Sequence, residues 1–280
     1  MRILYLDCFS GISGDMTLGA LVDAGADRAY IEDELSKIKL EPYSLDWKRV
    51  IKRGISATKL DVVLDPEHPP KHHRHYSEIV KVIREAKFSD RATALSLAIF
   101  EKIAIAEAKI HGTSIEKVHF HEVGAIDSIV DIVGVALAID SLHIERIYAS
   151  PVPLGSGTIH IDHGIYPVPA PATLEMMVGV PIASTPYAME MTTPTGAGII
   201  AGIVVGQIDP YIGKWQLTHE HLAHDHHHEH AHEDHHHYHG HDHHHHHEHT
   251  HDHDHDHDHT HHHDHDHDHH DHKHEHDHSH

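Results

Sequence analysis

Cysteine is almost absent from this 280-residue chain, because Cys8 is the only one. No disulfide can form within the chain, and metal sites of the zinc-finger kind, which need several thiolates, are excluded. Long apolar runs are absent as well. The apolar run before Asp7 is only four residues long, too short for a signal peptide, and no segment approaches a membrane span. We therefore expect a cytoplasmic protein with no membrane partner, whose metal chemistry uses histidine and carboxylate.

Basic residues are also scarce. The chain has 21 lysines and arginines against 44 aspartates and glutamates, a formal net charge of −23. A nucleic-acid binder usually carries a basic stripe, and none is visible in the sequence. The chain is therefore not expected to bind nucleic acid.

Histidine, by contrast, is abundant and unevenly placed. Of the 46 histidines, 36 lie between His219 and His280, together with 17 of the 44 acidic residues and a single base, Lys273. This tail holds about −16 of the formal charge and almost no apolar residue that could start a core. We expect residues 211–280 to be a separate, disordered segment.

The chemistry expected of the tail is metal binding. Neutral imidazole binds nickel, copper and zinc, and the interleaved carboxylates add oxygen ligands. Many interchangeable ligand sets favour storage and delivery over catalysis, because a catalytic ion needs fixed geometry. A solvated acidic tail or a purification tag is the alternative, but tags are short and uniform. Affinity order alone does not identify the metal.

Residues 1–210 have the pattern of an α/β domain with a mixed sheet and packed helices. Strand patterns alternate with helical spacing along the chain. Gly54 is suited to the turn of a β-hairpin. The expected strands are 2–8, 43–51, 55–64, 115–121 and 147–152, and the main expected helices are 29–38, 77–86, 90–111, 127–142 and 172–178.

The stretch 118–131 concentrates metal-binding side chains. His119 and His121 lie two apart on an expected strand and share one face, while Asp127 and Asp131 lie four apart on one face of the following helix. Together they would make a nitrogen and oxygen site for a divalent ion such as nickel, zinc or manganese. The alternative is a capped helix with core histidines, in which Asp127 serves the helix N-terminus.

Further histidines occur on two expected loops. One loop carries a cluster that suggests capture of a metal or an anion, although a solvated loop is the alternative: its candidate ligands are His72, His73 and His75. The other loop carries His160 and His163, which could bind a metal or move a proton.

Glycine-rich turns predict anion sites at three places. The loop before the first helix would let backbone amides approach an anion, although a tight turn with Asp15 as helix cap explains the spacing equally well. A second turn is flexible, and a third precedes a short helix in a pattern that fits phosphate or nucleotide contacts. The candidates are Ser10, Gly11, Gly14, Asp15, Gly155, Ser156, Gly157, Thr195 and Gly196.

Several motifs in order resemble the LarC family of nickel insertion proteins. They are DCFSGISGD at 7–15, HHRHY at 72–76, VHFHEVGAIDSIVD at 118–131, PLGSGT at 153–158, HGIYPVPAPA at 163–172 and TPTGA at 193–197. The resemblance covers residues 1 to about 205. It implies a cyclometallase of the lyase class that uses CTP with Mn²⁺ or Mg²⁺ to place Ni²⁺ into pyridinium-3,5-bisthiocarboxylic acid mononucleotide. The product is the nickel-pincer cofactor of lactate racemase.

The chain departs from the family after residue 205. Full-length members continue into a C-terminal domain that carries the CTP site, whereas here the sequence runs into the histidine tail. In some members the two halves are joined by a programmed frameshift, and this chain looks like the unshifted N-terminal product. We therefore expect activity only together with the C-terminal domain, and a homo-oligomer with apo lactate racemase among its partners.

Two functional hypotheses follow. In the first, the domain holds the mononucleotide near the glycine loops, His119, His121 and a carboxylate hold nickel, and Glu122, His160 or His163 removes the ring proton. In the second, the chain is a non-catalytic nickel store or metallochaperone whose tail carries the metal.

Overall fold

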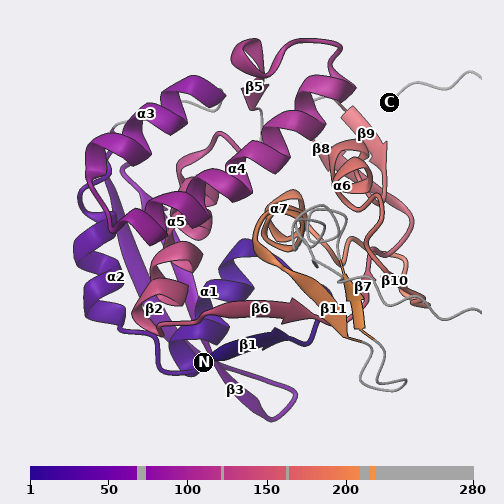
Figure 1. The fold of residues 1–280 in the computed structure, drawn as a ribbon, viewed down its shortest axis with the longest axis horizontal. Coiled ribbons are helices and arrows are strands. Elements are labelled where there is room, and N and C mark those ends of the chain that lie inside the picture. Colours follow the sequence, from indigo (N-terminus) through magenta and orange to yellow (C-terminus); the bar gives the residue numbers. More distant parts are fainter. Residues whose placement is uncertain (68–73, 121–122, 162–163, 209–214, 218–280) are drawn as a thin grey trace, which may run out of the picture. The chain divides into compact units, whose positions relative to one another are not determined.

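A four-stranded sheet gives the fold its framework (Figure 1). Three of its strands are parallel, and the last is antiparallel to its neighbour. The strands occur in the order β1 (Ile3–Leu6), β6 (Arg146–Ala149), β11 (Gly206–Ile208) and β12 (Trp215–Leu217). The mixed α/β class predicted from the sequence is confirmed.

The computed structural model describes residues 1–67, 74–120, 123–161, 164–208 and 215–217. Met1–Glu229 form one unit of the chain and His230–His280 a second, which lies wholly outside the described residues. The predicted boundary at residue 210 stays a prediction. No helix in the described ranges is long and apolar enough to cross a membrane.

Helix α5 (Ile126–Ser141) is largely buried, because it is apolar on nearly every side. It contacts α1 (Gly14–Asp23), α2 (Arg28–Leu35) and α4 (Asp90–Ile110). A Cβ at Gly134 would lie 2.6 Å from Leu18, so glycine permits the close approach of α1. The remaining helices are α3 (Tyr76–Ala86), α6 (Pro171–Met176) and α7 (Pro194–Ile203).

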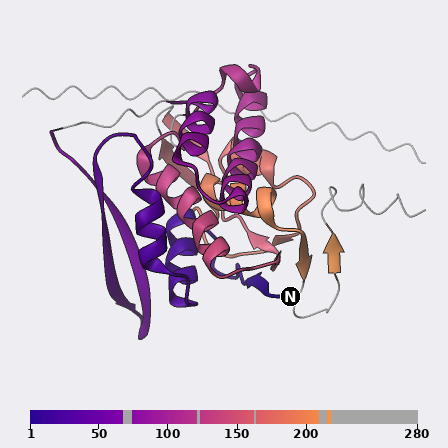
Figure 2. The ribbon, with the colours of Figure 1, turned by 60° about the vertical axis from the view of Figure 1, so that its left-hand side comes forward.

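The predicted β-hairpin is confirmed. Strands β2 (Tyr43–Lys52) and β3 (Ile55–Leu64) pair along their whole length, and the turn residues Arg53 and Gly54 both have positive φ. Figure 2 shows this hairpin beside the helices and apart from the main sheet. Asp23 at the end of α1 holds it in place, because its carboxylate accepts hydrogen bonds from the Thr58 backbone N–H and hydroxyl.

Two sequence predictions of strands are wrong in their extent. The segment 115–121 begins as a 3₁₀ turn, Ile115–Lys117, closed by a hydrogen bond from the Lys117 N–H to the Ser114 carbonyl. Of the described residues in this segment, β5 (His119–Phe120) forms the strand, pairing with β4 (Arg74–His75). The segment 147–152 is divided between β6 and β7 (Val152–Pro153), since Pro151 has no N–H for a ladder. Strand β7 pairs with β10 (Ile182–Ala183), and β8 (Thr158–Ile161) with β9 (Gly164–Pro167).

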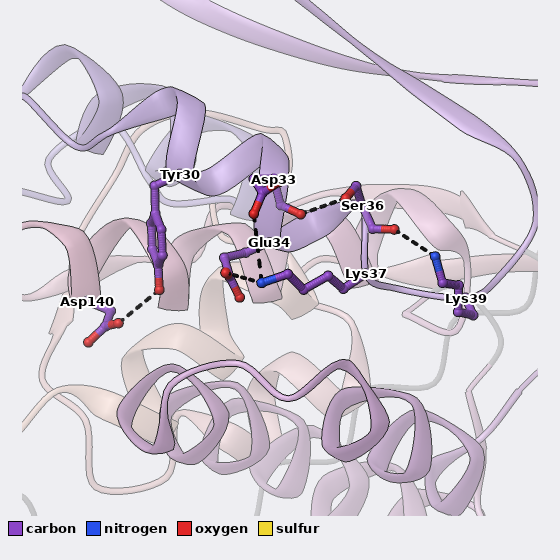
Figure 3. A network of polar contacts seen from close by, with 7 residues as sticks. All are labelled: Tyr30, Asp33, Glu34, Ser36, Lys37, Lys39 and Asp140. Atoms are coloured by element: carbon purple, nitrogen blue, oxygen red, sulfur yellow. Dashed lines mark hydrogen bonds and ion pairs between the residues drawn. The ribbon is translucent and has the colours of Figure 1, made fainter.

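A polar network fixes the end of α5 to its neighbours (Figure 3). The Tyr30 hydroxyl on α2 donates to Asp140 at 3.1 Å, and the same carboxylate accepts from Ser89, the N-cap of α4. Burial raises the pKa of Tyr30 to about 12, so the phenol remains a donor. Lys37 lies between Asp33 and Glu34 at the end of α2. The two contacts of Asp140 hold the end of α5 that is opposite to Asp127.

Candidate functional site

A pocket of about 470 Å³ lies where segments distant in the sequence meet. It is lined by parts of β3, α1, α5 and the segment that leads into α7. Five of the lining residues are carboxylates: Asp15, Asp61, Asp127, Asp131 and Glu190. The others are Ser13, Leu60, Val62, Val123, Ser128, Thr193, Pro194 and Thr195. Among the described residues, no lysine, arginine or histidine lines it.

Three helices begin at this pocket. Ser13 caps α1 by accepting the Met16 N–H, and Thr193 caps α7 by accepting the Gly196 N–H. Asp127 and Ser128 belong to the first turn of α5. The first amides of a helix lack partners within the helix, so each N-terminus favours negative charge. The pocket therefore combines dipoles that attract anions with carboxylates that attract cations.

Asp131 is the carboxylate of the pocket whose pKa is most strongly changed by its surroundings. It lies one helical turn after Asp127, is only partly exposed, and accepts a hydrogen bond from the Asp15 backbone N–H. Its pKa is raised to about 8, first by burial and then by the charges of Asp15 and Asp127. Three carboxylates in so small a space repel one another, and a bound cation would relieve that repulsion.

The two capped helices are joined directly to each other. The Gly14 N–H donates to the Thr195 hydroxyl at 3.2 Å, and that hydroxyl lies 2.9 Å from the Thr193 hydroxyl. The Ile12 N–H donates to the Met191 carbonyl, while the Thr193 N–H donates to the Ile12 carbonyl. This ladder places the starts of α1 and α7 side by side and forms one wall of the pocket.

The predicted glycines act mainly through backbone packing. A Cβ at Gly14 would lie 2.7 Å from the Asp131 Cβ, and one at Gly196 would lie 2.1 Å from the Ile12 carbonyl oxygen. Gly11 has φ +94°, and a side chain there would meet the Met191 carbonyl. Ser10 is exposed and is not among the lining residues.

The helix cap expected at Asp15 is wrong. Ser13 is the N-cap, because its backbone is extended and its hydroxyl accepts the Met16 N–H. Asp15 lies in the first turn of α1, where its carboxylate accepts the Ser13 hydroxyl and faces the pocket. Of the predicted residues, Asp15, Asp127, Asp131 and Thr195 thus line one cavity.

The turn at Gly155, Ser156 and Gly157 supports the pocket from outside. Gly155 bridges Glu190 and packs against the Met189 carbonyl, where a Cβ would lie 1.8 Å away. The Ser156 hydroxyl donates to the Tyr187 carbonyl at 3.2 Å, and Gly157 has φ +100°. These contacts position the segment that carries Glu190, and none of the three residues lines the cavity.

His160 lies on the exposed hairpin β8–β9 opposite Ile165, and it does not line the pocket. His163, the second predicted histidine there, lies outside the described residues, as do His72, His73, His121 and Glu122. Their expected roles stay predictions. Among the residues that are described, no three histidine, cysteine, aspartate or glutamate side chains form a preassembled metal cluster.

His75 and His119 do come together. They are partners in the β4–β5 pair, and their ring centroids lie 3.6 Å apart with a tilt of 41°. Two of the sequence motifs are thereby joined at one point of the surface.

Cys8 is kept out of metal chemistry by its surroundings. It is 2% exposed, and burial raises the pKa of its thiol to about 11. Its backbone N–H donates to the Ser150 hydroxyl, which joins the ends of β1 and β6. A buried neutral thiol is a poor ligand, so oxygen and nitrogen donors remain.

Sequence reasoning did not select Ser13, Asp61, Glu190 or Thr193 as individual site residues. Ser13 and Thr193 could have been found, since each precedes a helix pattern as a typical N-cap. The sequence around Asp61 does not indicate a site, because an aspartate on a strand of alternating polarity is expected to face solvent.

Comparison with known proteins identifies the family. The family model described as nickel insertion protein matches residues 4–212. The chain belongs to the nickel insertion protein family.

Relatives in this family are named pyridinium-3,5-bisthiocarboxylic acid mononucleotide nickel insertion protein. The one from Geobacillus kaustophilus is 56% identical over 207 residues, covering 71% of this chain and 50% of the relative. The relative from Clostridium kluyveri is 50% identical over 211 residues, which cover 72% of this chain and 53% of the relative. The relative from Staphylococcus epidermidis is 49% identical over 203 residues, which cover 72% of this chain and 51% of the relative. The chain spans about half the length of these relatives. No solved structure matches it.

Proposed function

We propose that this member of the nickel insertion family acts in the insertion of Ni²⁺ into pyridinium-3,5-bisthiocarboxylic acid mononucleotide, and that the pocket around Asp131 is the site. The single observation that carries the assignment is the meeting of Asp15, Asp127 and Asp131 with the starts of three helices. The printed names of the relatives supply the metal and the mononucleotide.

Both charges of the reaction have a place in this pocket. The carboxylates suit a divalent cation, because oxygen ligands bind nickel loosely enough to release it to sulfur and carbon. The helix N-termini suit the phosphate of a mononucleotide. We assign Asp15 and Asp127 to the ion, and the positive ends of the α1 and α7 dipoles to the phosphate.

Asp131 is suited to a different task. When nickel bonds to the ring carbon between two sulfurs, the proton on that carbon must leave, so each insertion releases one proton. A carboxylate whose pKa lies at about 8 is a stronger base than an ordinary aspartate near neutral pH. In this proposal Asp131 accepts the proton, a role for which the sequence alone pointed to Glu122, His160 or His163.

The rest of the reaction is assigned to the part of the family protein that this chain does not match. CTP with Mn²⁺ or Mg²⁺ would be held there, so the chain acts as one half of a lyase-class cyclometallase. The product would be the cofactor of lactate racemase, made in the cytoplasm. The resemblance of the motifs supports these assignments.

The test combines purified chain with the mononucleotide, Ni²⁺ and CTP, with and without the C-terminal half, and detects the metallated product by mass spectrometry. We expect product in the complete mixture and a loss of at least about 100-fold in rate for Asp127→Asn and Asp131→Asn. Asp33→Asn, an exposed carboxylate on α2, is the matched control and should retain full rate. Equal rates in all three variants would remove the pocket from the reaction.

Nickel storage is the second candidate, favoured by the 36 histidines between His219 and His280. Deleting residues 219–280 separates the two. Tight stoichiometric binding that survives the deletion and is lost in the His119→Ala/His121→Ala double variant supports a donor site within the domain. Complete loss of nickel on deletion alone supports storage.

A further inference from the structure

The β4–β5 pair brings two imidazoles from distant motifs onto one small platform. His75 ends β4, His119 begins β5, and the two residues are directly opposite each other in the ladder. Their ring centroids lie 3.6 Å apart. His119 is exposed and His75 is half-buried, so the pair can be reached from solvent.

The platform under these rings is rigid. Arg74 is 3% exposed, forms an ion pair with Glu41 and donates to the Gly124 carbonyl. Phe120 is fully buried, with Tyr76 edge-on at 6.2 Å and Phe100 at 6.3 Å. The backbones that carry both histidines are thus fixed by buried contacts on either side, as a binding site requires.

Helix capping does not account for the pair. The His75 backbone N–H donates to the Glu78 carboxylate at 3.3 Å, and the His75 side chain faces the Glu78 backbone N–H in a capping box at the start of α3. Its Nδ1 is nevertheless buried and has no hydrogen-bond partner among the described residues. Capping also gives no reason for His119, which lies on another element and turns its ring toward His75.

We propose that His75 and His119 form a nickel-receiving site, separate from the carboxylate pocket, which accepts the ion before it reaches that pocket. Two neutral imidazoles with water in the other positions suit Ni²⁺, and so few protein ligands suit a site that must release its ion. The inference rests on the proposed function for the identity of the metal and for the destination of the ion.

The location fits transfer to the pocket. Val123, which lines the pocket, is four residues beyond His119. Gly124 packs against the backbone of both strands, since a Cβ there would lie 2.8 Å from the Phe120 carbonyl oxygen and 3.1 Å from the Arg74 nitrogen. The same segment then enters α5, with Asp127 in its first turn. The receiving site and the insertion site are thus joined by one short stretch of chain.

The test uses the paramagnetism of Ni²⁺ and fluorine-labelled phenylalanine in the full chain. The four phenylalanines are Phe9, Phe88, Phe100 and Phe120, so the histidine tail contributes no fluorine signal. Ni²⁺ is added beyond the capacity of the tail, and ¹⁹F spectra are recorded. We expect the Phe120 signal to shift or broaden most, with a smaller effect on Phe100.

Three variants separate coordination from structure. His75→Asn keeps a residue that can cap α3 while removing the imidazole, and His119→Gln keeps a polar side chain on β5. Each should weaken the nickel effect on Phe120 by about tenfold or more. His143→Asn, an exposed histidine with positive φ elsewhere in the domain, should leave it unchanged.

A Phe120 signal that moves no more than Phe88, or that moves equally in His75→Asn, would overturn the receiving site. The measurement needs neither mononucleotide nor CTP. A chain that inserts no nickel can therefore still pass this test, and a chain that fails it can still insert nickel through the carboxylate pocket.

Discussion

At the scale of single residues, Asp131 is a partly buried carboxylate whose ionisation lowers the stability of the fold. An ordinary aspartate is ionised at neutral pH with little penalty, but here the surrounding protein and two nearby carboxylates oppose ionisation. The folded chain therefore holds the Asp131 proton more tightly than the unfolded chain does. A residue that lowers stability in this way is typical of a functional site.

The pH dependence of stability follows from this shift. Because the pKa of Asp131 rises from 3.8 to about 8 on folding, its contribution to stability is present below about pH 4 and is lost as pH rises to about 8. We expect Asp131→Asn, without metal, to melt at least about 3 °C above the parent chain at pH 9 and close to it at pH 4.5. Thermal unfolding at both pH values measures this.

The control for that experiment is Asp33→Asn, which should melt like the parent chain at both pH values because its carboxylate is exposed. Added Ni²⁺ should raise the melting temperature of the parent chain, while its effect on Asp131→Asn should be smaller. An Asp131→Asn chain that is less stable than the parent at pH 9 would contradict the electrostatic account.

At the scale of elements, the helix starts serve both folding and the pocket. Ser13 caps α1 at the pocket wall, whereas Ser89 caps α4 on another part of the domain. Both hydroxyls accept an amide three residues along, so their capping chemistry is the same. The pair allows a structural effect to be separated from an effect on binding.

We expect Ser13→Ala and Ser89→Ala each to lower the free energy of unfolding by about 1 kcal/mol, the usual cost of a lost N-cap. Only Ser13→Ala should also weaken phosphate or mononucleotide binding, because only it disturbs an amide terminus at the pocket. Urea unfolding and titration calorimetry with the mononucleotide measure the two effects. Equal binding by both variants would argue against an anion position at α1.

At the scale of the whole molecule, the chain combines a domain that contains a carboxylate pocket with a long histidine-rich segment, residues 219–280. Protons compete with metals for imidazole nitrogen in mildly acid solution, and carboxylates lose affinity only at lower pH. The two parts should therefore release nickel at different pH values.

Most nickel bound by the full chain should be released between pH 7 and about 5, because imidazole ligands dominate its capacity. Equilibrium dialysis against Ni²⁺ across this range gives the number of ions bound. A chain lacking residues 219–280 should show a small capacity with a weaker dependence on pH over the same interval. An unchanged capacity after deletion would contradict the assignment of metal binding to the tail.

The sequence by itself determined the donor chemistry and much of the fold. A single cysteine leaves histidine and carboxylate as metal ligands, and the 3.6-residue helical period alone places Asp127 and Asp131 on one helix face. The hairpin and the longer helices followed from local pattern as well, because patterns of this length leave few alternatives.

Tertiary structure alone decided which of these residues share a site. The starts of α1 and α7 lie side by side through backbone contacts at Ile12 and Thr193, which carry no side-chain signature. Asp61 reaches the pocket from a separate hairpin, and His75 meets His119 through strands only two residues long. Local propensity cannot specify such pairings, because their stability comes from burial shared among distant segments.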